Sequence, residues 1–420
     1  MKKYLLLVVA GFSFSAVESQ NISDALRYAQ ESLNGTARFN SMGGAFGALG
    51  GDFSSINVNP AGSAVFANTQ LGITLSNCNI KNQSDYYGQK NAINNSTFDF
   101  NQAGFVLVFD NSGTKNNWNK FVISINYDKA ANLNNSFFAS GTNPTNSVAD
   151  FFLSYANANA HQGGISLNAL NTYNYEDLNF PDQQAFLGYH AYIINPVNVN
   201  DPNNDSYTSN VPAGGKYYQD NYIESTGYNG KLAFNLSSQY KDKFSFGLNV
   251  NSYFTDYVQS TDFYEDNANS QTTGVRNINF INDLHTYGTG ISFQLGAIAK
   301  ITPSLRAGLA YESPTWYELN DELNQSLGSN GYYDPNATQP TLSNATANSD
   351  ITIAYEPYKL QTPGKWTGSL AYVFGKSGLI SFDVAIKDYG NTRFKSTGFN
   401  SVNTDMGNLL TYAPEFRLGV

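Results

Sequence analysis

A glycine-rich stretch near the N-terminus holds the residues of this 420-residue sequence that are spaced most like a binding motif. A phosphate-binding loop needs Gly-Lys-Ser/Thr after its glycines, and none follows here; the spacing does not match the dinucleotide fingerprint either. Glycine at this density permits positive φ and close backbone approach, which predicts a compact small-residue segment. The motif residues are Gly43, Gly44, Gly47, Gly50, Gly51, Asp52, Asn59, Pro60, Ala61 and Gly62.

Side chains suited to catalysis or metal binding are few and isolated. His161, His190 and His285 lack metal-ligand spacing, and we expect them to be solvated loop residues. The single cysteine, Cys78, cannot form an intrachain disulfide and is expected to be a small filler. No motif positions a Ser/His/Asp or Cys/His set, so the sequence predicts neither an enzyme nor a cofactor or metal site.

The elements that must position these residues show period-two alternation, which indicates β-strands. In "FSFGLNVNSYF" (244–254), large apolar side chains alternate with Ser, Gly and Asn, and similar alternation recurs in "LAFNLSSQY", "ISFQLGAIA", "LRAGLAY" and "LISFDVAIK". The polar face is mostly Ser, Asn, Gln and Gly, whereas a soluble sandwich exposes many Lys and Glu. We therefore expect Phe244, Phe246, Leu248 and Val250 to face lipid and the polar face to line a lumen.

Tight turns alternate with long connections, as in transmembrane β-barrels, and the long ones are expected at 255–287, 312–366 and 387–415. The fold class predicted is all-β, an antiparallel transmembrane barrel of about ten visible strands. These are expected near 69–79, 98–110, 119–128, 229–240, 244–254, 288–299, 305–312, 367–374, 379–388 and 415–420. The last strand stops in mid-pattern, and a barrel must close, so we expect the chain to be truncated at its C-terminus.

Composition and the N-terminus agree with an exported membrane protein. The net charge is −10, which argues against a nucleic-acid partner. Two lysines and a short apolar run predict a signal peptide at 1–19. A plug is expected at 20–66, beginning with a helix over 22–33 that Ser23 caps, and the barrel at 67–420.

The N-terminal stretch resembles the hatch of FadL-like outer-membrane transporters, which carry long-chain fatty acids and other hydrophobic compounds. The resemblance rests on "GTARFNSMGGAFGALGGDFSSINVNPAGSAVF", "GTGISFQLGAIAKITPSLRAGLAYESPTWYELND" and "LQTPGKWTGSLAYVFGKSGLISFDVAIKDYGNTRF". It implies a 14-stranded barrel with the hatch in its lumen, in the outer membrane of a Gram-negative bacterium. It also implies passive, ligand-gated uptake without a cofactor.

The resemblance further implies an apolar, fatty acid-like ligand, with outer-membrane lipid around the barrel and a monomer favoured. The hatch side chains expected to contact the ligand are Phe39, Met42, Phe46, Leu49 and Phe53. Arg306 on the wall is expected to bind a carboxylate head group. The alternatives are a nonspecific porin or structural barrel, a haemin receptor with a histidine ligand, and an outer-membrane lipid hydrolase.

The connection expected at about 129–228 is partly helical and extracellular. "SVADFFLSYANA" places Val148, Phe151, Phe152 and Tyr155 on one helical face, and "DQQAFLGYHAYII" does the same for Phe186, Tyr189 and Ile193. Two interpretations stay open: these faces pack together as a lid, which we expect for most of the residues, or they form an apolar groove for ligand capture.

Overall fold

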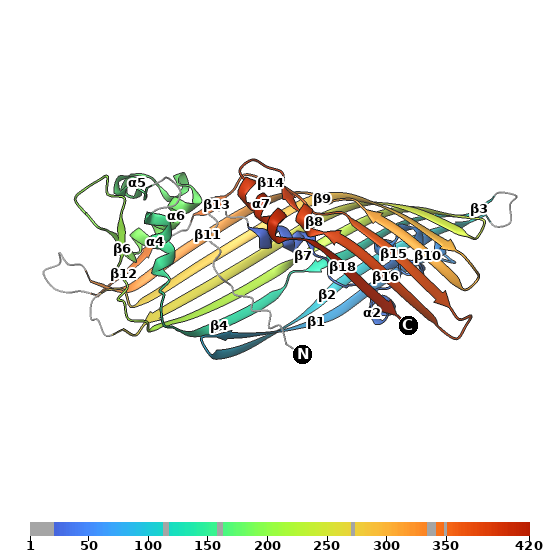
Figure 1. The fold of residues 1–420 in the computed structure, drawn as a ribbon, viewed down its shortest axis with the longest axis horizontal. Helices are drawn as coiled ribbons and strands as arrows, with labels where there is room; N and C mark the ends of the chain where they lie inside the picture. Colours follow the sequence, from blue (N-terminus) through green and yellow to red (C-terminus); the bar gives the residue numbers. More distant parts are fainter. Residues whose placement is uncertain (1–20, 112–116, 158–162, 270–273, 334–341, 348–350) are drawn as a thin grey trace.

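The computed structural model describes residues 21–111, 117–157, 163–269, 274–333, 342–347 and 351–420, and its main element is one long, curved, antiparallel sheet (Figure 1). Ten strands follow one another along this sheet, and each pairs with the next. They are β1 (Gln70–Tyr86), β2 (Gln89–Asp110), β3 (Trp118–Asn132), β7 (Tyr217–Tyr240), β8 (Phe244–Asn267), β9 (Asn277–Lys300), β10 (Leu305–Glu312), β15 (Lys365–Val373), β16 (Leu379–Asp388) and β18 (Tyr412–Gly419).

Further strands extend the sheet at the end opposite the tight hairpins. β4 (Asn135–Asn143) pairs with β7, and β11 (Trp316–Tyr333) pairs with β9 beyond the end of β10. β11 also pairs with β12 (Leu342–Ala347), β13 (Thr352–Ala354) and β14 (Tyr358–Gln361), and β14 pairs with β17 (Arg393–Phe394). A separate hairpin joins β5 (Ile194–Pro196) to β6 (Tyr207–Ser209).

All ten predicted strands are present, but several are much longer than predicted. The stretch 255–287 is mostly strand, since β8 runs to Asn267 and β9 begins at Asn277. The stretch 312–366 likewise contains β11 to β14, so both predictions of long connections were wrong. On β8 the apolar face ends near residue 254 while backbone pairing continues, which is why apolar alternation located only about half of the long strands β7, β8 and β9.

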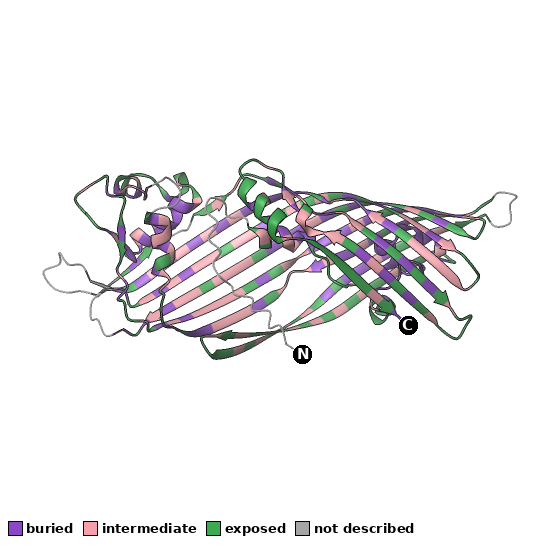
Figure 2. Cartoon of the chain, in the orientation of Figure 1, coloured by how far each residue is buried: buried purple, intermediate pink, exposed green. Residues whose placement is uncertain are grey.

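Exposed and buried residues alternate along the strands of the wall (Figure 2). Large apolar side chains are among the exposed ones and many Asn, Ser and Gln side chains are buried, the reverse of the arrangement in a soluble protein. Phe244, Phe246, Leu248 and Val250 are 38–47% exposed, as predicted, whereas Asn249 and Asn251 between and beyond them are fully buried. A polar face that is hydrogen-bonded inside and an apolar face left open fit a wall whose outer solvent is lipid.

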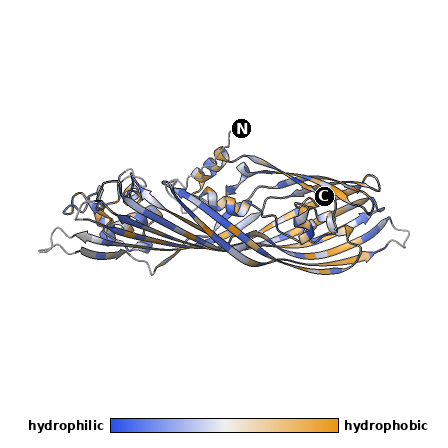
Figure 3. Ribbon diagram, turned by 90° about the horizontal axis from the view of Figure 1, so that it is seen from below, coloured by the Kyte–Doolittle hydropathy of each residue, from blue (hydrophilic) through white to orange (hydrophobic). Residues whose placement is uncertain are grey.

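Apolar residues are concentrated in the half of the sheet that carries the hairpin turns, where most of the ribbon is orange in Figure 3. On β8 it spans residues 244–254, about 25 Å in height for a tilted strand. Just beyond it, Asp256, His285 and Glu322 form an outward polar row on three neighbouring strands, with His285 Nε2 3.0 Å from Asp256 Oδ1. None of the helices in the described ranges has the length and apolar character needed to cross a bilayer.

Aromatic side chains lie at both borders of this apolar band. Trp118 contacts Tyr240 at the hairpin border, and Tyr311 contacts Trp366 at the other, with ring centroids 5.2 and 4.6 Å apart. Amphipathic rings at both interfaces are typical of membrane barrels.

The N-terminal segment lies against the inner face of the sheet and is called the hatch below, over residues 21–66. It contains α1 (Ile22–Ala29), α2 (Ala37–Ser41), α3 (Ser55–Val58) and the short 3₁₀ helix η1 (Pro60–Val65). α1 is capped by Asn21, whose Oδ1 accepts from the Ser23 and Asp24 amides, so the prediction of Ser23 as the cap was wrong. The helix also ends at Ala29, earlier than predicted.

Helices gather at the far end of the sheet from the hairpins (Figure 1). α4 (Ala149–Asn157), α5 (Leu167–Thr172) and α6 (Phe180–His190), with η2 (Tyr175–Asp177), pack on β9, β11 and β12 as one apolar cluster. α7 (Asn400–Leu409), which follows η3 (Tyr389–Asn391), packs instead against α1 and β14.

Candidate functional site

Asn59 joins the hatch to the wall and to its own turn. Its Nδ2 donates to the carbonyls of Gly47, at 2.7 Å, and of Ala297 on β9, at 3.1 Å. Its Oδ1 accepts from the Ala61 amide at 3.1 Å, and Pro60 starts η1, where its missing N–H is not needed. One buried amide therefore holds two hatch segments and the wall in register.

Further hydrogen bonds fix η1 against β7 and α3 against β8. Asn235 Nδ2 donates to the Pro60 carbonyl at 3.0 Å, and the Ser63 hydroxyl bonds Ser237 at 2.6 Å. Asn249 Nδ2 donates to the Ile56 carbonyl at 2.9 Å. The Asn and Ser residues of the polar strand face therefore satisfy the hatch backbone, besides facing the lumen.

Wall glycines let the hatch approach closely, and the sequence interpretation missed their role. A Cβ on Gly247 would lie 2.3 Å from the Pro60 carbonyl carbon, and one on Gly296 would lie 2.0 Å from Asn59 Oδ1. Gly247 and Gly296 are register partners on β8 and β9. Glycine at inward-facing positions of two adjacent strands is the sequence feature that could have indicated this close approach of the hatch.

The predicted hatch motif is one compact turn system. Gly43, Gly44, Gly50 and Gly51 all have φ between 57° and 74°, as the glycine density indicated. Asp52 lies within the hatch: it accepts from the Ser54 amide at 2.9 Å and the Thr36 hydroxyl at 2.8 Å. This carboxylate therefore caps the turn of the hatch.

The predicted apolar ligand residues of the hatch pack among themselves. Phe39, Met42, Phe46 and Leu49 are at most 7% exposed and form one cluster with Ala371 of β15. Phe53 lies apart, in a tilted ring contact with Phe66 and packed against Gly72 and Gly104 of β1 and β2. Of these five, only Phe39 lines the cavity described below.

The other predicted ligand residues lie at the two ends of the wall. Arg306 is close to a hairpin, and its Nη1 donates to the Leu49 carbonyl of the hatch at 3.1 Å. Phe151, Phe152, Tyr155, Phe186 and Tyr189 lie on α4 and α6. Phe152 is fully buried, and Phe151, Phe186 and Tyr189 pack partly against the same cluster, which agrees with the lid interpretation.

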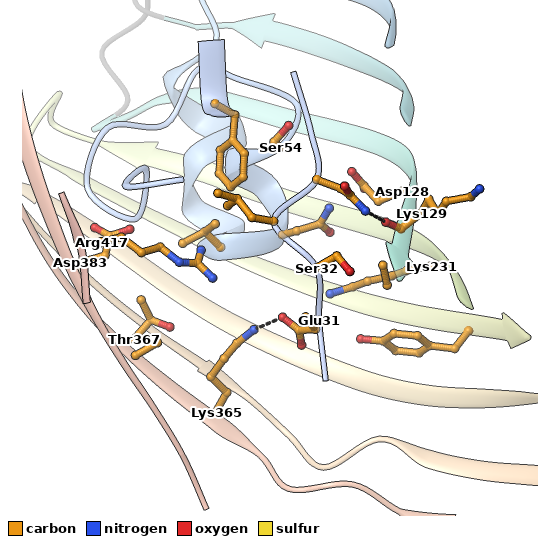
Figure 4. A pocket seen from close by; sticks show the side chains of 18 residues that line it. Glu31, Ser32, Ser54, Asp128, Lys129, Lys231, Lys365, Thr367, Asp383 and Arg417 are labelled. Atoms are coloured by element: carbon orange, nitrogen blue, oxygen red, sulfur yellow. Dashed lines mark hydrogen bonds and ion pairs between the residues drawn. The ribbon is translucent and has the colours of Figure 1, made fainter. Parts of the chain in front are cut away.

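A cavity of about 80 Å³ opens beside the hatch, and its lining combines apolar and charged side chains (Figure 4). Leu33, Phe39 and Val58 form the apolar part. Glu31 of the hatch and Lys365 of β15 point toward each other there, with Lys365 Nζ 2.6 Å from Glu31 Oε2.

Five charged groups form a cluster at this cavity, referred to below as the lysine cluster: Glu31, Lys231, Glu312, Lys365 and Lys387. Glu312 receives Lys231 at 3.2 Å, Lys365 at 3.1 Å and the Tyr253 hydroxyl at 3.0 Å. Lys387 Nζ lies 3.6 Å from Glu31 Oε1. Three ammonium groups thus share two carboxylates, which leaves the cluster positive.

Desolvation of Glu31 among the surrounding wall and hatch groups would by itself raise its pKa, but Lys365, Lys387 and Lys231 together hold the pKa of this carboxyl well below its usual range. Glu31 therefore stays ionised at neutral pH. The sequence interpretation missed the whole cluster, because Glu31 and Lys365 are 334 positions apart and come from different elements.

The described histidines occupy ordinary structural positions. His285 lies on β9, facing outward, rather than in a loop. His190 ends α6, where its Nε2 is 3.0 Å from the Leu170 carbonyl oxygen, and His161 lies outside the described residues. The predicted loop location was therefore wrong for both described histidines.

Residues 195–372, which include β7 to β11 and three of the five lysine-cluster residues, match the family model for outer membrane protein transport protein (OMPP1/FadL/TodX). The FadL-like resemblance is thereby confirmed. The match covers less than half of the chain and includes the wall strands on both sides of the β8–β9 pair. Residues 7–156, including the hatch, match an uncharacterised protein family (UPF0164).

The solved structures that resemble the chain include two hydrocarbon transporters. The CymD monoaromatic hydrocarbon channel has a TM-score of 0.39 at 10% identity, covering 93% of this chain and 77% of its own. The toluene transporter TodX of Pseudomonas putida has a TM-score of 0.39 at 13% identity, covering 93% and 78%. No curated protein matches the chain significantly.

Proposed function

We propose that this FadL-like protein takes up hydrophobic compounds by passive, ligand-gated diffusion, and that long-chain fatty acids are among its substrates. The observation that supports this substrate class is the mixed lining of the hatch cavity, where Phe39 and Val58 face the same space as Lys231 and Lys365. An alkyl chain with an anionic head has matching chemistry, since apolar walls bury the chain and ammonium groups bind the carboxylate.

The size of the cavity supports gating. A space of about 80 Å³ holds a few waters but is far smaller than the volume that an amphiphile needs. The hatch fills the lumen next to it and is hydrogen-bonded to β7, β8, β9 and β16. Ligand passage in this proposal therefore requires part of the hatch to move.

The proposal also covers how the chain is exported and how its segments are organised. Residues 1–19, which lie outside the described residues, act as the signal peptide; residues 20–66 act as the hatch within the 67–420 barrel. The helices of the 129–228 region face the exterior. Arg306, half-buried near the hairpins, is proposed to bind the ligand carboxylate a second time as the ligand leaves the barrel.

Uptake by intact cells tests this function. The gene is expressed in a Gram-negative host that lacks its own fatty-acid channel, and the entry of labelled hexadecanoate is compared with that of a small polar sugar. We expect hexadecanoate uptake to rise and sugar uptake to stay at the level of cells without the protein. Faster sugar entry without hexadecanoate entry would instead favour the porin alternative.

A further inference from the structure

We propose that Lys365 and Lys387 form a carboxylate-binding site that the protein's own Glu31 occupies at rest, and that an alkyl carboxylate binds by exchanging with this side chain. The inference rests on the proposed uptake of hydrophobic compounds and specifies the ligand as anionic. In this proposal the Glu31 carboxylate takes the place of the ligand's carboxylate in the resting protein.

The wall supplies the permanent part of this site. Glu312 is held by Lys231, Lys365 and the Tyr253 hydroxyl, and its side chain is only 5% exposed. This carboxylate belongs to β10 and cannot leave without disrupting the wall. It is therefore a fixed counter-ion for the lysines.

Glu31 differs from Glu312 in exposure and in backbone setting. Its side chain is 39% exposed, toward the cavity, although the Lys365 and Lys387 side chains that bind it are only 13% exposed. It lies in the irregular segment between α1 and α2. A carboxylate on such a segment can withdraw, whereas the lysines cannot follow it.

The net charge of the lysine cluster favours a ligand carboxylate that replaces Glu31 over one that binds in addition to Glu31. With Glu31 in place the cluster carries three lysines and two glutamates; without it, three lysines face Glu312 alone. Four other charged side chains line the cavity, and each has its own partner: Lys129 binds Asp99, Arg417 binds Glu415, Asp128 accepts from Gln102, and Asp383 accepts from the Gly47 amide. A ligand carboxylate thus finds its strongest attraction where Glu31 now lies.

Exchange would loosen one part of the hatch. Besides the Glu31 ion pairs, the segment is held by the Ser32 amide donating to Ala130 O at 3.0 Å, by Asn34 Nδ2 donating to Lys129 O at 3.1 Å, and by Lys387 Nζ donating to Ala29 O at 2.6 Å. Lys387 takes part in both sets, so a ligand on Lys387 competes for the Ala29 contact as well. Ligand binding is thereby coupled to release of residues 29–34.

The test compares dodecanoate with dodecanol on the purified chain, by calorimetric titration of the native protein and of Glu31→Gln. Removing the internal competitor should tighten dodecanoate binding by about tenfold, the worth of one charge-assisted contact, and leave dodecanol unchanged. Lys387→Met should weaken dodecanoate alone. Glu356→Gln, at an exposed loop glutamate, is the matched control and should change neither affinity.

A second measurement needs no variant. In the native protein, saturating dodecanoate should speed amide hydrogen exchange at residues 30–34, and saturating dodecanol should not. Unchanged exchange, or equal shifts of both affinities in Glu31→Gln, would overturn the exchange site while leaving hydrophobic uptake intact. Binding of neither compound would overturn the proposed function itself.

Discussion

At the residue scale, the hatch depends on positions where any side chain is too large. The inward Gly247 of β8 leaves room for the Pro60 backbone, and a Cβ there would lie 2.4 Å from the Pro60 carbonyl oxygen. The clash is with main chain, which has no rotamer to move away. The glycine therefore determines how closely η1 can approach the wall.

Gly247→Val is expected to displace η1 and destabilise hatch docking by about 1–3 kcal/mol, the usual cost of overpacking, while the strands still assemble. Limited proteolysis of the hatch together with heat-modifiable gel mobility would report the two effects separately. Gly368→Val is the control, because nothing lies within 4 Å of that Cβ on β15. Equal protease resistance in both variants would contradict the close-packing argument.

The sequence predicted some of these residues and not others, for a physical reason. Positive φ at Gly43 and Gly50 follows from local composition, since only glycine adopts it freely. The pairing of Glu31 with Lys365 depends on which strands become neighbours, and single-sequence alternation carries no such information. Local sequence composition therefore predicted the compact glycine-rich turns of the hatch. The lysine cluster could not be predicted in this way, because it forms only through tertiary contacts.

At the element scale, each long strand is divided into a lipid-facing part and a water-facing part. On β8 the outward residues change from Phe246 and Val250 to Asp256 and then Asp262. Backbone pairing with β9 continues without a break across this change. Strand length was underestimated because hydrophobic alternation detects the contact with lipid rather than the hydrogen-bonded ladder.

This division predicts a position-dependent cost of charge. Phe246→Arg, within the apolar band, should lower folding stability by about 2–4 kcal/mol, whereas Val258→Arg on the same outward face should cost about 0–1 kcal/mol. Urea unfolding in lipid vesicles would measure both. Similar costs at the two positions would show that the band has been placed wrongly along β8.

At the scale of the whole molecule, the sheet brings distant parts of the chain to one cavity. The hatch supplies Glu31 and Phe39, β7 supplies Lys231, and β15 supplies Lys365. The apolar band lies toward the hairpins, and the α4–α6 lid lies at the opposite end (Figures 1 and 3). In the proposed uptake, a ligand passes this cavity between the two ends, and the hatch contributes Leu33, Phe39 and Val58 to its apolar part.

Such a route predicts that affinity follows ligand length. Each added CH₂ is worth up to about 0.8 kcal/mol, or roughly fourfold in affinity, before entropy costs reduce the gain. In a series from octanoate to hexadecanoate, binding should strengthen steadily, and Phe39→Ala should flatten the series because this ring lines the cavity. Phe374→Ala, at an exposed aromatic near a hairpin, should leave the slope unchanged. A slope that is flat in the unmodified protein would mean that the alkyl chain is not buried, and the apolar part of the cavity would then have no role in binding.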